Sequence, residues 1–280
     1  MPVTPEDISK VIVTIKNYSS YDFSQYSKKS FTRRIEKVLI DYRLDIDKLI
    51  NSIKNKPEFI EDLVRSITVN TTELFRDPRL WQTIRYRVLS KLASNRKINI
   101  WHAGSSTGQE VYSMLILLNE MGLLDQANVF ASDINTDVLK KAKIGEYSYR
   151  FNLEYFENFD KVIKENPFKL DEFSEVPYEK YFDVNKLNDT IKVKDFIRKK
   201  PVWLKHDMVT EGNIFNTKFD LILCRNVLIY FDTDLQNRVI NTFYQSLFRN
   251  GILLLGVHES IMGAITNNFI KSGLVYQKKK

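Results

Sequence analysis

The chain has 280 residues, of which 43% are hydrophobic and 28% charged, and its formal net charge is +7. This composition is typical of globular proteins and excludes a collagen-like, low-complexity or disordered chain, while the length suits one large α/β domain or a medium domain with a small one. No apolar run reaches the length of a membrane helix, about 18 residues, and the N-terminus lacks a basic and apolar leader. We therefore expect a cytoplasmic protein without membrane insertion.

Cysteine and histidine are scarce. The single cysteine, Cys224, excludes an intramolecular disulfide and a cysteine-based zinc cluster. A multi-histidine metal site would need nearly all of His102, His206 and His258, so no metal is expected. The positive net charge indicates an anionic partner, such as nucleic acid, an acidic lipid surface or an acidic protein, or it serves solubility alone.

Residues 5–68 are predicted to be helical, because apolar residues recur there at spacings of three and four, as in half-buried helices. The repeats are Ile8-Val11-Ile12-Ile15, Phe31-Ile35-Val38-Leu39, Ile46-Leu49-Ile50-Ile53 and Phe59-Leu63-Val64-Ile67. Pro57 stands where the last helix can start, and no glycine precedes Gly104. We predict a small N-terminal all-helical domain over residues 1–68.

The predicted helix at residues 28–43 concentrates positive charge. It carries Lys28, Lys29, Arg33, Arg34, Lys37 and Arg43 against only Glu36 and Asp41. The chain also ends Lys278-Lys279-Lys280, which fits a frayed, solvated tail.

From residue 97 onward, short apolar runs alternate with helical patterns. Strands are expected at residues 97–101, 129–132, 203–205, 219–224 and 251–256, and helices at 111–118, 138–142 and 235–248. This alternation predicts a doubly wound α/β sheet over residues 69–280. The polar and aromatic stretch at about residues 146–200 breaks the rhythm, so we interpret it as an insertion or small subdomain.

Two features point to a cofactor at the carboxyl ends of the strands. The loop Ala103-Gly104-Ser105-Ser106-Thr107-Gly108 follows the first strand, and Asp133 ends the second. A glycine loop lets backbone amides approach an anionic or polar group, and an acid at that place typically accepts ribose hydroxyls. Asp133 can equally cap the next helix. The loop lacks a pyrophosphate fingerprint, so the combination favours S-adenosylmethionine, with Glu110 facing its amine or merely offsetting the helix dipole.

Two further groups follow later strands. Asp207 and Met208 come after the third strand, where a carboxylate can accept from an adenine amine and a methionine can pack on the base; a surface turn is the alternative. Arg225 and Asn226 come directly after a buried strand, which packing does not explain. Cys224 lies inside that apolar strand, so we interpret it as a core residue and not as a nucleophile.

One segment joins the helical region to the sheet. Its sequence is NTTELFRD at residues 70–77. Threonine and aspartate are capping residues, so on its own the segment indicates only the start of a helix.

Together these blocks resemble the CheR-type chemotaxis receptor methyltransferases. The resemblance covers nearly the whole chain: YDFS at 21–24, RRI at 33–35, NTTELFRD at 70–77, AGSSTGQE at 103–110, ASDI at 131–134, GEY at 145–147 and CRNVLIYF at 224–231. The family usually has Phe-Phe-Arg where this chain has Leu74-Phe75-Arg76, and Gly-Glu-Glu-Pro-Tyr-Ser where it has residues 108–113. The stretch at 146–200 matches the family poorly.

The resemblance implies a Rossmann-like, S-adenosylmethionine-dependent methyltransferase domain that forms methyl esters on glutamate side chains of cytoplasmic chemoreceptor helices and releases S-adenosylhomocysteine. The implied cofactor-contact positions are Asn70, Thr72, Arg76, Gly104, Glu110, Asp133, Asp207, Met208, Arg225 and Asn226. Arg76 and Tyr230 match positions beside the transferred methyl group. The basic residues Lys28, Lys29, Arg33, Arg34 and Lys37 would dock the receptor, and no nucleic acid is then expected. A nucleic-acid methyltransferase and a non-catalytic scaffold are the alternatives, although the chain has neither an Asn/Asp-Pro-Pro-aromatic motif nor a Pro-Cys loop.

Overall fold

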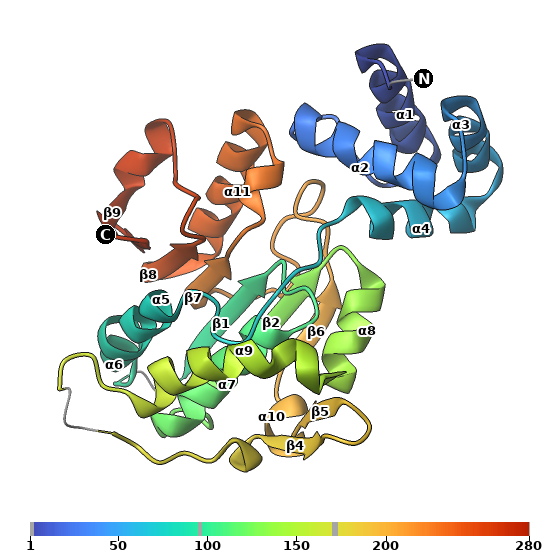
Figure 1. Cartoon of the computed structure of the whole chain (residues 1–280). Coiled ribbons are helices and arrows are strands. Elements are labelled where there is room, and N and C mark those ends of the chain that lie inside the picture. The colour runs from blue at the N-terminus through green and yellow to red at the C-terminus, as the bar shows by residue number, and fades with distance from the viewer. Residues whose placement is uncertain (1–2, 95–96, 170–172, 280) are drawn as a thin grey trace.

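The computed structural model describes residues 3–94, 97–169 and 173–279 (Figure 1). The chain begins with four helices, α1 (Pro5–Tyr18), α2 (Lys28–Tyr42), α3 (Ile46–Asn55) and α4 (Pro57–Ile67). Thr4 and Asp7 form a capping box at the start of α1, and Asp45 caps α3 by accepting from Lys48 N. The apolar residues at helical spacing form one buried cluster, so this region has its own core.

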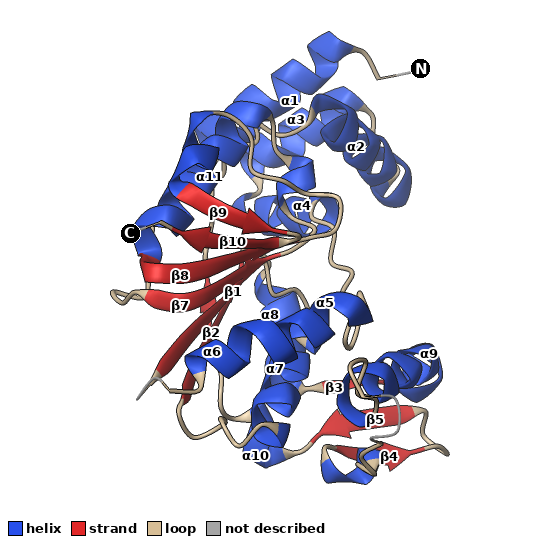
Figure 2. Ribbon diagram, turned by 90° about the vertical axis from the view of Figure 1, so that its left-hand side faces the viewer, coloured by secondary structure: helices blue, strands red, loops and turns tan. Residues whose placement is uncertain are grey.

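The rest of the chain is built on a sheet of seven strands in the order β6-β2-β1-β7-β8-β10-β9 (Figure 2). The strands are β1 (Ile98–Ala103), β2 (Ala127–Asp133), β6 (Val202–Lys205), β7 (Phe219–Cys224), β8 (Leu247–Leu255), β9 (Phe269–Ser272) and β10 (Val275–Lys278). In sheet order, the five strands from β6 to β8 pair in parallel, whereas β10 pairs antiparallel with both β8 and β9. This confirms the predicted doubly wound α/β sheet, with its strand order reversing direction between β1 and β7.

Side chains of β7 alternate between two cores, as the pleat of a strand requires. Leu221 and Leu223 pack in the cluster that contains α7 (Gln109–Glu120), and Ile222 and Cys224 pack in the cluster that contains α11 (Thr233–Ser246). Helices cover both faces of the sheet (Figure 2). The remaining helical segments of this part are α5 (Pro78–Thr83), the π-helix Ile84–Leu89, α6 (Ser90–Leu92), α8 (Thr136–Ile144), and the 3₁₀ turns Leu228–Tyr230 and Ala264–Asn268.

The stretch that broke the strand–helix rhythm forms a small antiparallel sheet of its own, in the order β3-β5-β4. Its elements are β3 (Glu146–Ser148), α9 (Tyr149–Phe159), the π-helix Asp160–Lys164, the 3₁₀ turn Tyr178–Lys180, β4 (Phe182–Asn185), β5 (Thr190–Val193) and α10 (Asp195–Arg198). The Tyr147 hydroxyl donates to Thr107 O at 2.6 Å, so β3 directly supports the glycine loop after β1.

Two local predictions were wrong at the C-terminal end. The helix expected at residues 235–248 ends at Ser246, because Leu247 pairs with Phe219 as the first residue of β8. Lys278 does not belong to a frayed tail: it lies in β10, and its Nζ donates to Tyr244 O at 2.7 Å and to Leu247 O at 3.1 Å. Lys280 lies outside the described residues.

The helical region lies beyond the carboxyl ends of the central strands (Figure 1). Tyr26 forms an antiparallel bridge with Phe231, and the N–H of Ser27 donates to Tyr230 O at 2.8 Å. The chain just before α2 is therefore fastened to the loop that follows β7. In the part of the chain that the structure describes, no helix is both long and apolar enough to cross a bilayer.

Candidate active site

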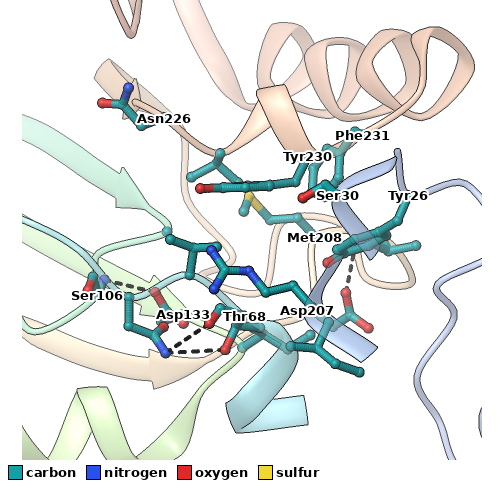
Figure 3. Close-up of a pocket in the computed structure, with 18 of the residues that line it drawn as sticks. Tyr26, Ser30, Thr68, Ser106, Asp133, Asp207, Met208, Asn226, Tyr230 and Phe231 are labelled. Atoms are coloured by element: carbon teal, nitrogen blue, oxygen red, sulfur yellow. Dashed lines mark hydrogen bonds between the residues drawn. The ribbon is translucent and has the colours of Figure 1, made fainter. Parts of the chain in front are cut away.

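A pocket opens at the carboxyl edge of the sheet, where the strand order reverses between β1 and β7 (Figure 3). Such a switch point is where open α/β sheets bind their ligands. The pocket holds about 820 Å³ of empty space, a volume that includes the part open to solvent. Its wall includes Asn70, Gly104, Asp133, Asp207, Met208, Arg225, Asn226 and Tyr230.

A smaller cavity of about 310 Å³ adjoins the pocket and shares Gly104, Ser106, Arg225 and Asn226 with it. Thr72, Arg76 and Glu110 line this second cavity. All residues that the sequence nominated for the cofactor or for catalysis therefore gather around two adjoining spaces.

The glycine loop passes close to its neighbours. Gly104 has φ +81°, and a Cβ there would lie 2.5 Å from Val227 Cγ2. Gly108 has φ +91°, and a Cβ there would lie 2.9 Å from both Ala142 Cβ and Trp203. Glycine at both positions therefore lets the loop pack closely against these neighbours, and Gly104 also lines the pocket.

Asp133 is buried at the end of β2 and does not cap α8. Its carboxylate accepts from Ser106 N at 2.8 Å and from Asn135 N at 2.9 Å, while the Asn135 side chain caps the helix by accepting from Asp137 N. Burial raises the pKa of Asp133, and the backbone donors offset part of this rise. Each carboxylate oxygen has a further lone pair, so Asp133 can also accept from ligand hydroxyls.

Asp207 and Met208 line the same pocket beyond β6. Burial raises the pKa of Asp207, whose carboxylate accepts from Val209 N at 2.9 Å. The neighbouring His206 is also buried and hydrogen-bonds Gly212 O through Nε2 at 2.9 Å, which gives this imidazole a structural role.

Arg225 is the centre of a buried ion network. Its side chain is 1% exposed and donates to Glu110 Oε2 at 3.0 Å and to Asp77 Oδ2 at 2.6 Å. A further bond joins it to Arg76 O at 2.9 Å. Desolvation would raise the pKa of Glu110, but the hydrogen bond from His102 and the charge of Arg225 lower it below its ordinary 4.5. The segment 70–77 is thereby tied to α7 and to the end of β7.

The backbone of segment 70–77 is unusual. Phe75 is fully buried with φ +51°, and Asp77 has φ +60°. Left-handed conformations of such residues persist only where the surroundings enforce them. Here Phe75 N donates to Ser113 Oγ at 2.8 Å. The segment thus folds back onto α7, and Arg76 comes to line the cavity beside Arg225.

Several buried polar atoms near this cavity have no partner among the described residues. They are Ser105 Oγ, Ser106 Oγ, Arg225 Nε and His102 Nε2. Buried polar atoms without partners are rare in proteins and indicate a missing ligand or water. The hydroxyl and guanidinium donors suit the carboxylate of a methionyl group, and the Glu110 carboxylate suits its ammonium. The residues present therefore fit S-adenosylmethionine.

Tyr230 lies where the N-terminal helices contribute to the pocket. Burial raises the pKa of its hydroxyl, and the positive charges of Arg34 and Arg76 oppose this rise. Arg34 was assigned only to docking by the sequence, yet it lines the pocket with Tyr26 and Ser30. No local sequence pattern separates Arg34 from its neighbour Arg33.

Cys224 is fully buried in β7. Burial raises the pKa of its thiol well above the ordinary value. A thiol in this state is a poor nucleophile. In the described part of the chain, no group of three or more His, Cys, Asp or Glu side chains is placed to hold a metal ion.

The doubly wound sheet, the pocket at its switch point and a matching family model together identify the class as an S-adenosylmethionine-dependent methyltransferase fold. The family model described as CheR methyltransferase, SAM binding domain, matches residues 70–276, and the chain belongs to this family. It is 36% identical to the protein named Cher3 of Pseudomonas putida, over 92% of this chain and 90% of that protein. Proteins named chemotaxis protein methyltransferase from Listeria monocytogenes (27% identity, 91% of this chain and 92% of theirs) and Borreliella burgdorferi (28%, 93% and 90%) are also similar.

The ion network yields a stability prediction. Arg225→Met leaves the Glu110 and Asp77 carboxylates without their cation, and we expect a loss of about 3–5 kcal/mol in the free energy of unfolding, measured by urea denaturation. Arg150→Met, which removes only an exposed contact with Asp189, should change it by less than about 1 kcal/mol.

The same variant should change the response to acid. Because the pKa of Glu110 is lowered in the folded protein, the stability it contributes is present above pH 4.5 and is lost as the pH falls through its folded value. In Arg225→Met this acid-linked loss should shrink. Equal stability of wild type and Arg225→Met at neutral pH would contradict the network.

Proposed function

We propose that the protein transfers the methyl group of S-adenosylmethionine to glutamate side chains on the cytoplasmic helical region of chemoreceptors, forming methyl esters. Support comes from the relatives named chemotaxis protein methyltransferase. The observation that carries the proposal is the placement of two cationic side chains around the site: Arg34 lines the cofactor pocket together with Tyr230, and Arg76 lines the adjoining cavity. Two cationic side chains at this place attract a carboxylate, and an ionised carboxylate needs no general base to act as the nucleophile.

We assign to each part of the cofactor a group that lines the pocket or the adjoining cavity. Asp133 would accept from the ribose hydroxyls, and Asp207 from the adenine amine with Met208 packed on the base. Glu110 would meet the ammonium group. The other cofactor contacts proposed are Asn70, Thr72, Arg76, Gly104, Arg225 and Asn226. S-adenosylhomocysteine, the product, would occupy the same contacts.

The bound cofactor supplies an electrophilic methyl group on its sulfonium. The chain's task is to align the substrate carboxylate with it. A glutamate has a reference pKa of about 4.3, so at neutral pH it is already the nucleophile; a carbon–oxygen bond forms, the sulfur–methyl bond breaks, and no proton moves. Arg76 would orient the carboxylate by charge-assisted hydrogen bonds, and Tyr230 would donate one bond or form the wall of the methyl path.

The charge of the arginines must not hold the carboxylate too tightly, because that negative charge is consumed in the transition state. Tyr230 is half-buried, so it also excludes water and partly desolvates the nucleophile.

Helix α2 would bring the receptor to this site. Lys28, Lys29, Arg33 and Lys37 are exposed on it, whereas Arg34 turns into the pocket. One helix thus offers a basic outer face to an acidic receptor helix and a cation to the reacting carboxylate.

Replacement of Arg76 tests the chemistry. Arg76→Ala should lower the single-turnover rate constant by about 100-fold or more at saturating cofactor, the scale of losing one preorganised electrostatic group. The affinity for S-adenosylhomocysteine, measured by calorimetry, should fall far less. Arg79→Ala, an exposed arginine three residues further on, is the control and should behave as wild type. Full activity of Arg76→Ala would refute this mechanism.

Charge reversal on α2 tests the docking. The double variant Arg33→Glu with Lys37→Glu should raise the KM for a receptor fragment and leave cofactor affinity unchanged. Wild-type turnover should weaken in 1 M salt, where the Debye length is about 3 Å. Lys10→Glu with Lys54→Glu reverses the same charge on other helices and should have little effect. If both double variants behave alike, α2 is not the docking face.

A further inference from the structure

Glu259 is a buried carboxylate, 7% exposed, just beyond β8, and within the described ranges it has no cationic partner. Its partners are backbone N–H groups. Oε2 accepts from Asn226 and from Gly256, each at 2.8 Å. Oε1 accepts from Val227 at 2.9 Å and from Ile229 at 3.3 Å. Since all four partners are donors, only the ionised carboxylate satisfies them all.

The backbone around Glu259 is shaped to this carboxylate. A Cβ on Gly256 would lie 2.7 Å from Glu259 Oε2 and 2.9 Å from Asn226 N, so a larger residue would push the two apart. Asn226 itself has φ +60°, a left-handed conformation. The close approach at Gly256 and the bend at Asn226 let one carboxylate reach donors from two segments.

The loop held by Glu259 carries Tyr230. The N–H of Tyr230 donates to Val227 O at 3.1 Å, which closes the 3₁₀ turn, and Val227 packs against Gly104 of the glycine loop. At the far end, Ser27 N donates to Tyr230 O. Glu259 thus holds the turn from the sheet, and the segment before α2 holds it from the other side.

Packing alone does not account for this carboxylate, because burying a charge is costly unless it is fully hydrogen-bonded, and a turn can be held by apolar contacts. We propose that Glu259 is a positioning residue for methyl transfer: its four hydrogen bonds fix the turn at residues 226–230 and so place Tyr230 beside the reacting groups. The inference rests on the proposed function. Glu259 itself does not line the pocket; it holds Asn226 and Val227, which do, and so acts through the turn that carries Tyr230.

The test is the variant Glu259→Gln, which keeps the size of the side chain but turns an amide NH₂ toward backbone donors. The kcat for receptor methylation should fall about 10-fold or more, because small misplacements at a reacting centre are costly. The loss should persist at saturating S-adenosylmethionine and at a temperature where the variant is fully folded, because the lost hydrogen bonds also lower its stability and Asn226 is a proposed cofactor contact. Glu157→Gln, the same change at an exposed carboxylate of α9, is the matched control.

A double-mutant cycle with Tyr230→Ala separates positioning from general loosening. If Glu259 acts through Tyr230, the double variant should be no slower than Tyr230→Ala alone, since the misplaced group is then absent. The proposal would be overturned if the losses in kcat from the two substitutions multiplied in the double variant. It would also be overturned if either Glu259→Gln or Tyr230→Ala were as fast as wild type.

If Glu259→Gln does not fold, Gly256→Ala provides the same cycle, because it displaces the carboxylate without removing it. A wild-type protein that methylates no receptor would refute the proposed function. An active wild type with multiplying losses would refute only the role of Glu259.

Discussion

The buried guanidinium of Arg225 is the contact on which the site depends. It joins Asp77 and Glu110, which lie 148 and 115 positions away in the sequence, and so binds the connecting segment, helix α7 and the end of β7 into one unit. Removing one partner from a buried ion pair leaves the other charge uncompensated, which is strongly destabilising. The same network holds segment 70–77 against the sheet, which is why Arg76 can line a cavity together with Gly104, Glu110 and Arg225.

Helix α2 and the end of α4, from the N-terminal helical region, help to line the site. The bridge between Tyr26 and Phe231 and the bond from Ser27 to Tyr230 fasten α2 to the loop after β7, and Arg34 enters the pocket from that helix. In the proposed reaction, one rigid helix therefore links recognition of an acidic partner to orientation of its carboxylate. This arrangement suits a reaction in which the nucleophile arrives already ionised and needs only placement and desolvation.

The sheet was predictable from sequence because its strands are nearly continuous apolar runs, such as residues 219–224, and because Gly104 and Asp133 stand directly after two of them. The short β9–β10 pair was not expected, and the start of β8 at Leu247 depends on pairing with Phe219, which no local pattern encodes. The contribution of Arg34 and Glu259 to the site escaped sequence reasoning for a similar reason. A charged residue's role in a tertiary network is set by where the backbone carries it, and the left-handed turns at Phe75, Asp77 and Asn226 are enforced by contacts distant in the chain.

The most direct test of the account is the chemical nature of the methyl group that the protein transfers. The full-length protein would be incubated with methyl-labelled S-adenosylmethionine and chemoreceptors in membranes, and the labelled receptor would then be treated with mild base. The account predicts label on receptor glutamates that base releases as methanol, and no label where those glutamates are replaced by alanine. Label that resists base, or that appears on nucleic acid and not on the receptor, would contradict it.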